Sequence, residues 1–158
     1  MNLTVDIQSA STEPAPEEGD IRHWISSALT GAPEQRDAFE VSVRLVDEAE
    51  MAKLNSNYRG KSGATNVLSF PSDLPADLQL PLLGDIVICV PVVAREAGEQ
   101  GKPLQAHWAH MAVHGTLHLL GYDHINDTDA ARMENLETDI LKLLDYPCPY
   151  TGYPIKGH

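Results

Sequence analysis

Four short segments of the chain carry the apolar pattern of β-strands. Apolar and polar residues alternate near the N-terminus and again about thirty-five residues later, and two further apolar runs follow, so that the segments cover residues 3–7, 39–45, 66–70 and 84–89. Alternation with a period of two indicates a strand with one buried face, and a short continuous apolar run is typical of a buried strand. The pattern therefore predicts a sheet of roughly four strands.

Between and after these strands, apolar residues recur at helical spacing. The helices predicted from this spacing, from capping residues and from Gly or Pro stops cover residues 20–30, 47–55, 91–100, 103–120 and 127–144. Residues 9–19 are expected to form an exposed loop, residues 58–65 a loop, and residues 146–158 an irregular tail. These elements predict an α+β fold, a single domain spanning residues 1–158 in which a mixed sheet packs against about five helices.

Composition narrows the classes of protein that fit. The chain has 158 residues, a formal net charge of −12 and only two cysteines, Cys89 and Cys148. The cysteine count argues against a disulfide framework and rules out a zinc site made only of cysteines. No signal peptide or membrane-spanning run is recognisable, so we expect a cytoplasmic protein. The acidity argues against general nucleic-acid binding, although a local cationic patch could still engage a polyanion, and the charge could equally serve solubility alone.

Three histidines close together in the sequence predict a metal site. His114 and His118 are four residues apart on the longest predicted helix, so their rings lie on one helix face, and Gly121 can end the helix and return His124 towards them. Three neutral nitrogen ligands with a fourth position open are typical of a catalytic zinc. The alternative is a set of core histidines that bond to carbonyls or carboxylates. For His107 and His110 we favour a structural role or one that supports the metal ligands from behind, although His110, one turn from His114, could also contact the cleft.

The same histidine spacing occurs in the metzincin proteases. Those enzymes carry a glutamate after the first histidine, where it deprotonates the zinc-bound water, but this chain has Gly115 at that position. A metallopeptidase therefore remains an alternative that lacks its general base.

A second group of residues suits phosphate binding. Arg59 and Lys61 lie in a polar segment that leads into the predicted strand at residues 66–70. A guanidinium presents a planar fork of donors that matches phosphate oxygens, and a lysine adds a point charge. Near a metal these cations could hold a phosphodiester; the alternative is a solvated loop with no ligand.

Taken together, these segments resemble the bacterial YbeY family. The likeness extends from about Val41 to Leu144 and is most specific in residues 55–71, in Gly84–Ile86 and in residues 114–124. The resemblance implies an α+β fold with one Zn²⁺ held by His114, His118 and His124. It also implies a single-strand-specific endoribonuclease of small-subunit (16S) rRNA maturation and ribosome quality control, with Arg59 and His114 as catalytic residues. The implied partners are single-stranded rRNA and the small ribosomal subunit with its assembly factors. Where family members often carry an acidic residue and a proline, this chain has Ser62 and Ala64.

The leading hypothesis is therefore a metal-dependent endoribonuclease in which Arg59 and Lys61 bind the scissile phosphate. The sequence does not identify the general base; Asp85 and Asp123 are candidates for it, or for orienting a histidine from behind. The alternatives are a non-catalytic metal-binding ribosome assembly factor and the metallopeptidase.

Overall fold

A four-stranded mixed sheet forms the centre of the described structure, a computed structural model that describes residues 2–32, 38–72, 81–122 and 126–150. The strands lie in the order β1-β2-β4-β3. Their bounds are β1 (Asn2–Ser9), β2 (Ala38–Val46), β3 (Val67–Pro71) and β4 (Leu82–Cys89). β1 pairs with β2, and β2 with β4, in parallel, whereas β3 runs antiparallel to β4. The predicted α+β class and mixed sheet are confirmed.

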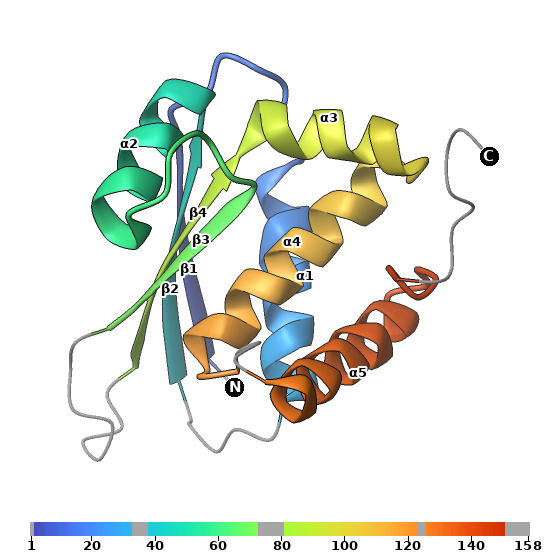
Figure 1. Cartoon of the computed structure of the whole chain (residues 1–158). Helices are drawn as coiled ribbons and strands as arrows, with labels where there is room; N and C mark the ends of the chain where they lie inside the picture. The colour runs from blue at the N-terminus through green and yellow to red at the C-terminus, as the bar shows by residue number, and fades with distance from the viewer. Residues whose placement is uncertain (1, 33–37, 73–80, 123–125, 151–158) are drawn as a thin grey trace.

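Five helices accompany this sheet in the described part of the chain. They are α1 (Glu18–Gly31), α2 (Glu48–Arg59), α3 (Val90–Gln100), α4 (Leu104–Leu119) and α5 (Asp127–Leu143). α4 packs on β3 and β4, and α1 and α5 pack around α4, while α2 covers the opposite face of the sheet (Figure 1). Two apolar clusters result, one on each face: Ile86 and Ile88 contribute to the larger one, and Val87 and Cys89 to the smaller one beneath α2.

Helix α4, which carries most of the histidines, is a core helix. Its buried residues face in nearly all directions and include Trp108, Val113 and Leu117. This agrees with the sequence pattern, because a helix that is apolar on most sides requires neighbours on most sides. No helix within the described ranges has both the length and the apolar content that crossing a membrane requires.

Two predicted helix boundaries were wrong. α1 begins at Glu18 rather than Asp20, since the amide of Asp20 already bonds to the carbonyl of Glu17. α2 continues four residues beyond Asn55, to Arg59, so the predicted loop at 58–65 begins only at Gly60. Gly60 ends α2 with φ +67°, a left-handed conformation that glycine adopts without strain. The second correction matters for function because it places Arg59 on the last turn of a helix.

Candidate metal centre and cleft

His114 and His118 bring two ring nitrogens together on one face of α4. Their Nε2 atoms are 3.0 Å apart and their ring centroids 4.5 Å apart. Two nitrogens bound to one tetrahedral zinc at about 2.0–2.1 Å would lie roughly 3.3 Å apart. The predicted convergence of the two rings is confirmed, and their separation is compatible with two ligands of one ion.

The chain stops being helical directly after this pair. Gly121 has φ +101°; its amide donates to the carbonyl of His118, and the amide of Tyr122 donates to the carbonyl of Leu117. This pair of hydrogen bonds is the Schellman ending, in which glycine supplies the left-handed residue. The predicted stop at Gly121 is confirmed. His124 and Asp123 lie outside the described residues.

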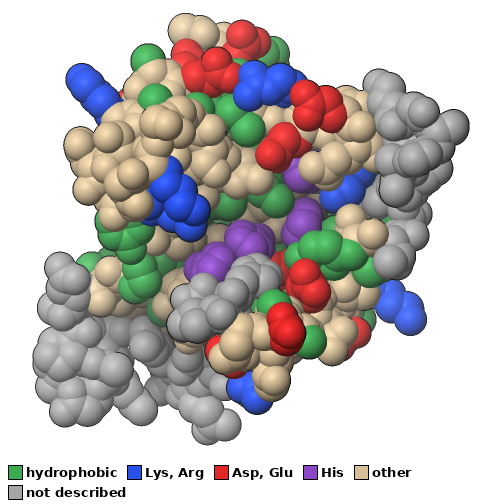
Figure 2. Space-filling view, viewed as in Figure 1, with side chains coloured by type: hydrophobic (Ala, Val, Ile, Leu, Met, Phe, Trp, Pro, Cys, Tyr) green, Lys and Arg blue, Asp and Glu red, His purple; other side chains and the backbone are tan. Residues whose placement is uncertain are grey.

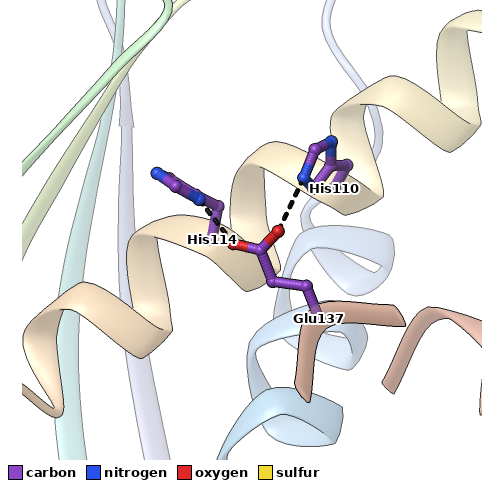
Figure 3. Close-up of side chains that lie close together, drawn as sticks. All are labelled: His110, His114 and Glu137. Carbon is purple, nitrogen blue, oxygen red and sulfur yellow. Dashed lines mark hydrogen bonds and ion pairs between the residues drawn. The ribbon is translucent and has the colours of Figure 1, made fainter. Parts of the chain in front are cut away.

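Glu137 on α5 is a buried carboxylate directly beside the histidines (Figure 3). Its side chain is 0 % exposed; Oε1 lies 2.5 Å from Nδ1 of His114, and Oε2 lies 3.0 Å from Nε2 of His110. The hydroxyl of Tyr150 also donates to Oε2. Three donors thus surround one carboxylate inside the protein, which offsets the cost of removing the charge from water.

The ionisation of Glu137 determines which nitrogens of the rings carry protons. Burial alone would raise the pKa of Glu137, but the hydrogen bonds from His110 and His114 outweigh it and hold the pKa below its ordinary value. An ionised carboxylate can only accept, so Nδ1 of His114 donates to it. When the ring is neutral, Nε2 of His114 then carries no proton, and its lone pair faces His118. Burial lowers the pKa of His110, which favours the neutral ring there.

An ion could therefore bind on either of two sides of the His114 ring, at Nδ1 or at Nε2. On the Nδ1 side, atoms of His110, His114 and Glu137 lie within 4.8 Å of one another, a group that could hold a metal ion. On the Nε2 side lies His118. On the first side the nitrogens already donate to Glu137, so an ion there would have to displace these hydrogen bonds. On the second side Nε2 of His114 lies in a hydrogen bond with Nε2 of His118, so an ion there would replace a contact between its own two ligands.

His107 and His110 are core histidines, each bonded to a carboxylate through Nε2, while Nδ1 of each is buried with no hydrogen-bond partner among the described residues. Both are nearly fully buried. Nε2 of His107 is 3.0 Å from Glu96, which also accepts from the side-chain amide of Asn66. Each of the two histidines is therefore held by a carboxylate from another helix.

A cleft of about 660 Å³ joins the histidine pair to Arg59. Arg59, His114 and His118 all line it, together with Ser69 and Tyr122. In Figure 2 the histidine side chains follow one another along a hollow across this face of the molecule. Two groups of residues that are 55 positions apart in the sequence thus share one cavity of the size that holds small ligands.

Other residues singled out in the sequence lie elsewhere. Lys61 is exposed and is not among the residues that line the cleft. Asp85 is exposed on β4 and alternates in phase with Val87 and Cys89, so it lies on the sheet face that α2 covers, away from α4. The structure therefore does not bring Asp85 to the histidines.

Gly115 faces the sheet at close range. A Cβ at this position would lie 3.0 Å from Cγ2 of Ile86 and 3.4 Å from Oγ of Ser69. Oγ of Ser69 also donates to the carbonyl of Gly115 at 2.9 Å. A glutamate, the base that a metzincin protease carries here, would have to enter the packing between α4 and the sheet. The position that would carry peptidase chemistry is used for close packing instead.

Sequence reasoning missed Glu137 and Tyr150. A signal for Glu137 was present, because it falls on the buried side of α5 with Met133, Ile140 and Leu141. A carboxylate on the apolar face of an amphipathic helix requires a buried partner. For Tyr150, which follows the last helix, the sequence held no comparable signal.

Comparison with known proteins places the chain in a family. The family model described as Endoribonuclease YbeY matches residues 6–145. A Pseudomonas syringae pv. tomato protein named Endoribonuclease YbeY is 57% identical over 158 residues, covering 99% of this chain and 93% of its own length. A Pseudomonas putida protein of the same name is 57% identical over 150 residues, covering 94% of this chain and 93% of its own. A solution structure of a Thermotoga maritima protein, 23% identical, covers 88% of this chain and 87% of its own with a TM-score of 0.56, a likeness of fold. With a family match over nearly its whole length and relatives at this identity, the chain belongs to the YbeY family.

Proposed function

We propose that this chain is a zinc-dependent, single-strand-specific endoribonuclease acting in 16S rRNA maturation and ribosome quality control. The relatives named Endoribonuclease YbeY, at 57% identity, support hydrolysis of RNA. The observation that carries the proposal is that Arg59 lines the same cleft as His114 and His118. In this proposal residues 1–158 act as one domain in the cytoplasm, on single-stranded rRNA of the small ribosomal subunit and alongside its assembly factors.

The residues proposed to hold zinc are His114 and His118, through Nε2, and His124 as the third ligand. The 3.0 Å separation of the two Nε2 atoms and the hydrogen bond from Nδ1 of His114 to Glu137 support this choice. A carboxylate behind a ligating histidine fixes its tautomer and ring orientation. When bound, zinc supplies Lewis acidity towards a phosphate oxygen or a water molecule.

Arg59 is proposed to bind the scissile phosphate. It is the only Lys or Arg among the described residues that line the cleft. A guanidinium can bond two phosphate oxygens at once and stabilise negative charge that builds up on them in the transition state. Lys61, two residues further on and exposed, is proposed to add a second positive charge for phosphate binding. Such a focused cation is compatible with a net charge of −12, since the strand is engaged at one place only.

The described walls of this cleft contain no Asp or Glu. A carboxylate general base would therefore have to come from outside them, and Asp123 is the remaining candidate of the two that the sequence suggested.

One experiment tests the proposal directly. Purified protein is analysed for metal content and incubated with a labelled single-stranded rRNA precursor, the matching duplex and an unstructured peptide, with and without chelator. The expected result is zinc in the protein and cleavage of the single strand alone, abolished by chelator and restored by added zinc. Cleavage of the peptide instead would support the metallopeptidase.

Arg59→Ala separates the enzyme from a non-catalytic assembly factor, with Lys53→Ala, an exposed cation on the same helix, as its control. For an enzyme, Arg59→Ala keeps its zinc and its binding to the small subunit but loses cleavage by more than about tenfold. A zinc-loaded wild type that binds subunits and cleaves no RNA would support the assembly factor.

A further inference from the structure

A second cleft opens beside the first. It has a volume of about 500 Å³, and Asn66 and His114 line both clefts. The two cavities therefore meet at the proposed metal ligand. The second cleft is therefore one path open to a strand whose phosphate lies between Arg59 and the histidine pair.

Tyr150 gives the second cleft a fixed aromatic wall. Its hydroxyl donates to the buried Glu137, and its ring lies edge-on against the ring of His110, with centroids 5.5 Å apart. Nevertheless the residue is 46 % exposed. An aromatic ring that is anchored at one end and exposed at the wall of a cavity is the platform on which proteins stack unpaired nucleobases.

The polar groups of this cleft suit a base better than a phosphate. Its walls contain two carboxylates, Glu96 and Glu99, against one cation, Lys102. Glu96 is held in place by His107 and by the side-chain amide of Asn66. Fixed carboxylate oxygens repel phosphate but accept hydrogen bonds from the amino and imino groups on base edges. Phosphate is thus favoured beside Arg59, and a base beyond His114.

We propose that the second cleft binds the nucleobase of a nucleotide adjacent to the scissile phosphate, with Tyr150 as its stacking surface and Glu96 as an acceptor for its edge. The inference rests on the proposed function for the direction of the strand. It also gives a physical reason for a preference for single strands, because the base in a duplex is stacked and paired and cannot enter the cleft.

The test is a double-mutant cycle in which one change is made in the protein and the other in the RNA substrate. Single-stranded oligoribonucleotides that contain one cut site are prepared with an abasic ribose at each position within two nucleotides of the cut. Cleavage and equilibrium binding are measured for the wild type, Tyr150→Ala and Tyr150→Phe. In the wild type, loss of the base at one position should weaken binding and raise KM by about tenfold. In Tyr150→Ala the same loss should cost no more than about twofold.

Tyr150→Phe is the matched control. It keeps the ring and removes the hydrogen bond to Glu137, so the tenfold penalty at the abasic position should persist even if overall activity falls. A merely structural role of Tyr150 predicts instead that the base and the side chain act independently, with the same abasic penalty in all three proteins at every position. That outcome, or the absence of any RNA binding, overturns the inference. Coupled binding without cleavage would refute the proposed nuclease and leave the base-binding cleft standing.

Discussion

His114 and Glu137 are 23 residues apart in the sequence, yet Nδ1 of the histidine lies 2.5 Å from Oε1 of the glutamate. The contact ties α5 to α4 and turns the other nitrogen of the ring towards His118. A buried hydrogen bond to a carboxylate is poor evidence for stability by itself, because desolvation of the charged group offsets the attraction. Its consequence is orientation: the ring has one tautomer and one direction in which to offer a lone pair.

Replacing His114 by alanine should lower metal content and thermal stability together. The variant removes one proposed ligand and leaves Glu137 with one donor fewer, and the free energy of metal binding is also free energy of folding. We expect metal affinity to fall by more than about tenfold and the melting temperature to drop. His23→Ala, an exposed histidine on α1, is the control. Unchanged zinc in His114→Ala by elemental analysis would refute the assignment.

Glu137→Gln tests the orienting carboxylate. A glutamine of similar shape offers one acceptor oxygen and turns an amide donor towards the other histidine or Tyr150. Metal affinity, measured by competition with a chelator, should fall by about 10- to 100-fold. Asp85→Asn is the control, because the sequence suggested this carboxylate but it lies on the far face of the sheet. The metal affinity of this variant should match that of the wild type. The opposite ranking of these two variants would show that the hydrogen bond to Glu137 does not orient His114.

Gly115→Glu should cost stability and create no peptidase. The new side chain must enter the packing against Ile86 and Ser69, so the free energy of unfolding should fall by at least about 2 kcal/mol. Gly98→Ala, on α3 with nothing within 4 Å of the added Cβ, should instead stabilise by roughly 0.5–1 kcal/mol. Denaturant titration gives both numbers. A Gly115→Glu protein as stable as the wild type would show that the close approach seen here does not constrain this position.

Acid should weaken the link between α3 and α4. Burial opposes the ionisation of Glu96, but hydrogen bonds from His107 and Asn66 outweigh it and place the pKa of Glu96 below its ordinary value of 4.5. When folding lowers the pKa of a carboxyl, that group stabilises the folded protein fully at pH values above its pKa in the unfolded chain. This contribution is lost as the pH falls through its pKa in the folded protein. The stability difference between the wild type and Glu96→Gln should therefore be constant above about pH 5.5 and shrink below about pH 4.5. Glu99→Gln, an exposed neighbour, is the control, and a difference that stays constant down to pH 3 would contradict the prediction.

The sequence by itself determined the features that depend on neighbours within one turn or one strand. Alternation predicted two of the strands and short apolar runs the other two, and helical spacing predicted the five helices. The four-residue separation of His114 and His118 was enough to bring their rings together. The stop at Gly121 was equally local, because it depends on the conformations open to glycine. The errors in predicting helices and strands were confined to their ends. The continuation of α2 to Arg59 is an example, because the residues there are too weakly apolar to show a helical spacing.

Only the tertiary structure decided which distant residues meet. Asp85 and Glu137 were both carboxylates within the family-like region, and nothing in their neighbourhoods fixed a distance to His114. Asp85 is far from His114 because its side chain lies on the face of the sheet that α2 covers. Glu137 is close to His114 because α5 packs against α4. Likewise, the sequence shows only that Gly115 stands where a metzincin protease has its catalytic glutamate. The fold shows that this position packs closely between α4 and the sheet. Such pairings depend on which surfaces bury one another, a property of the whole chain that no local pattern contains.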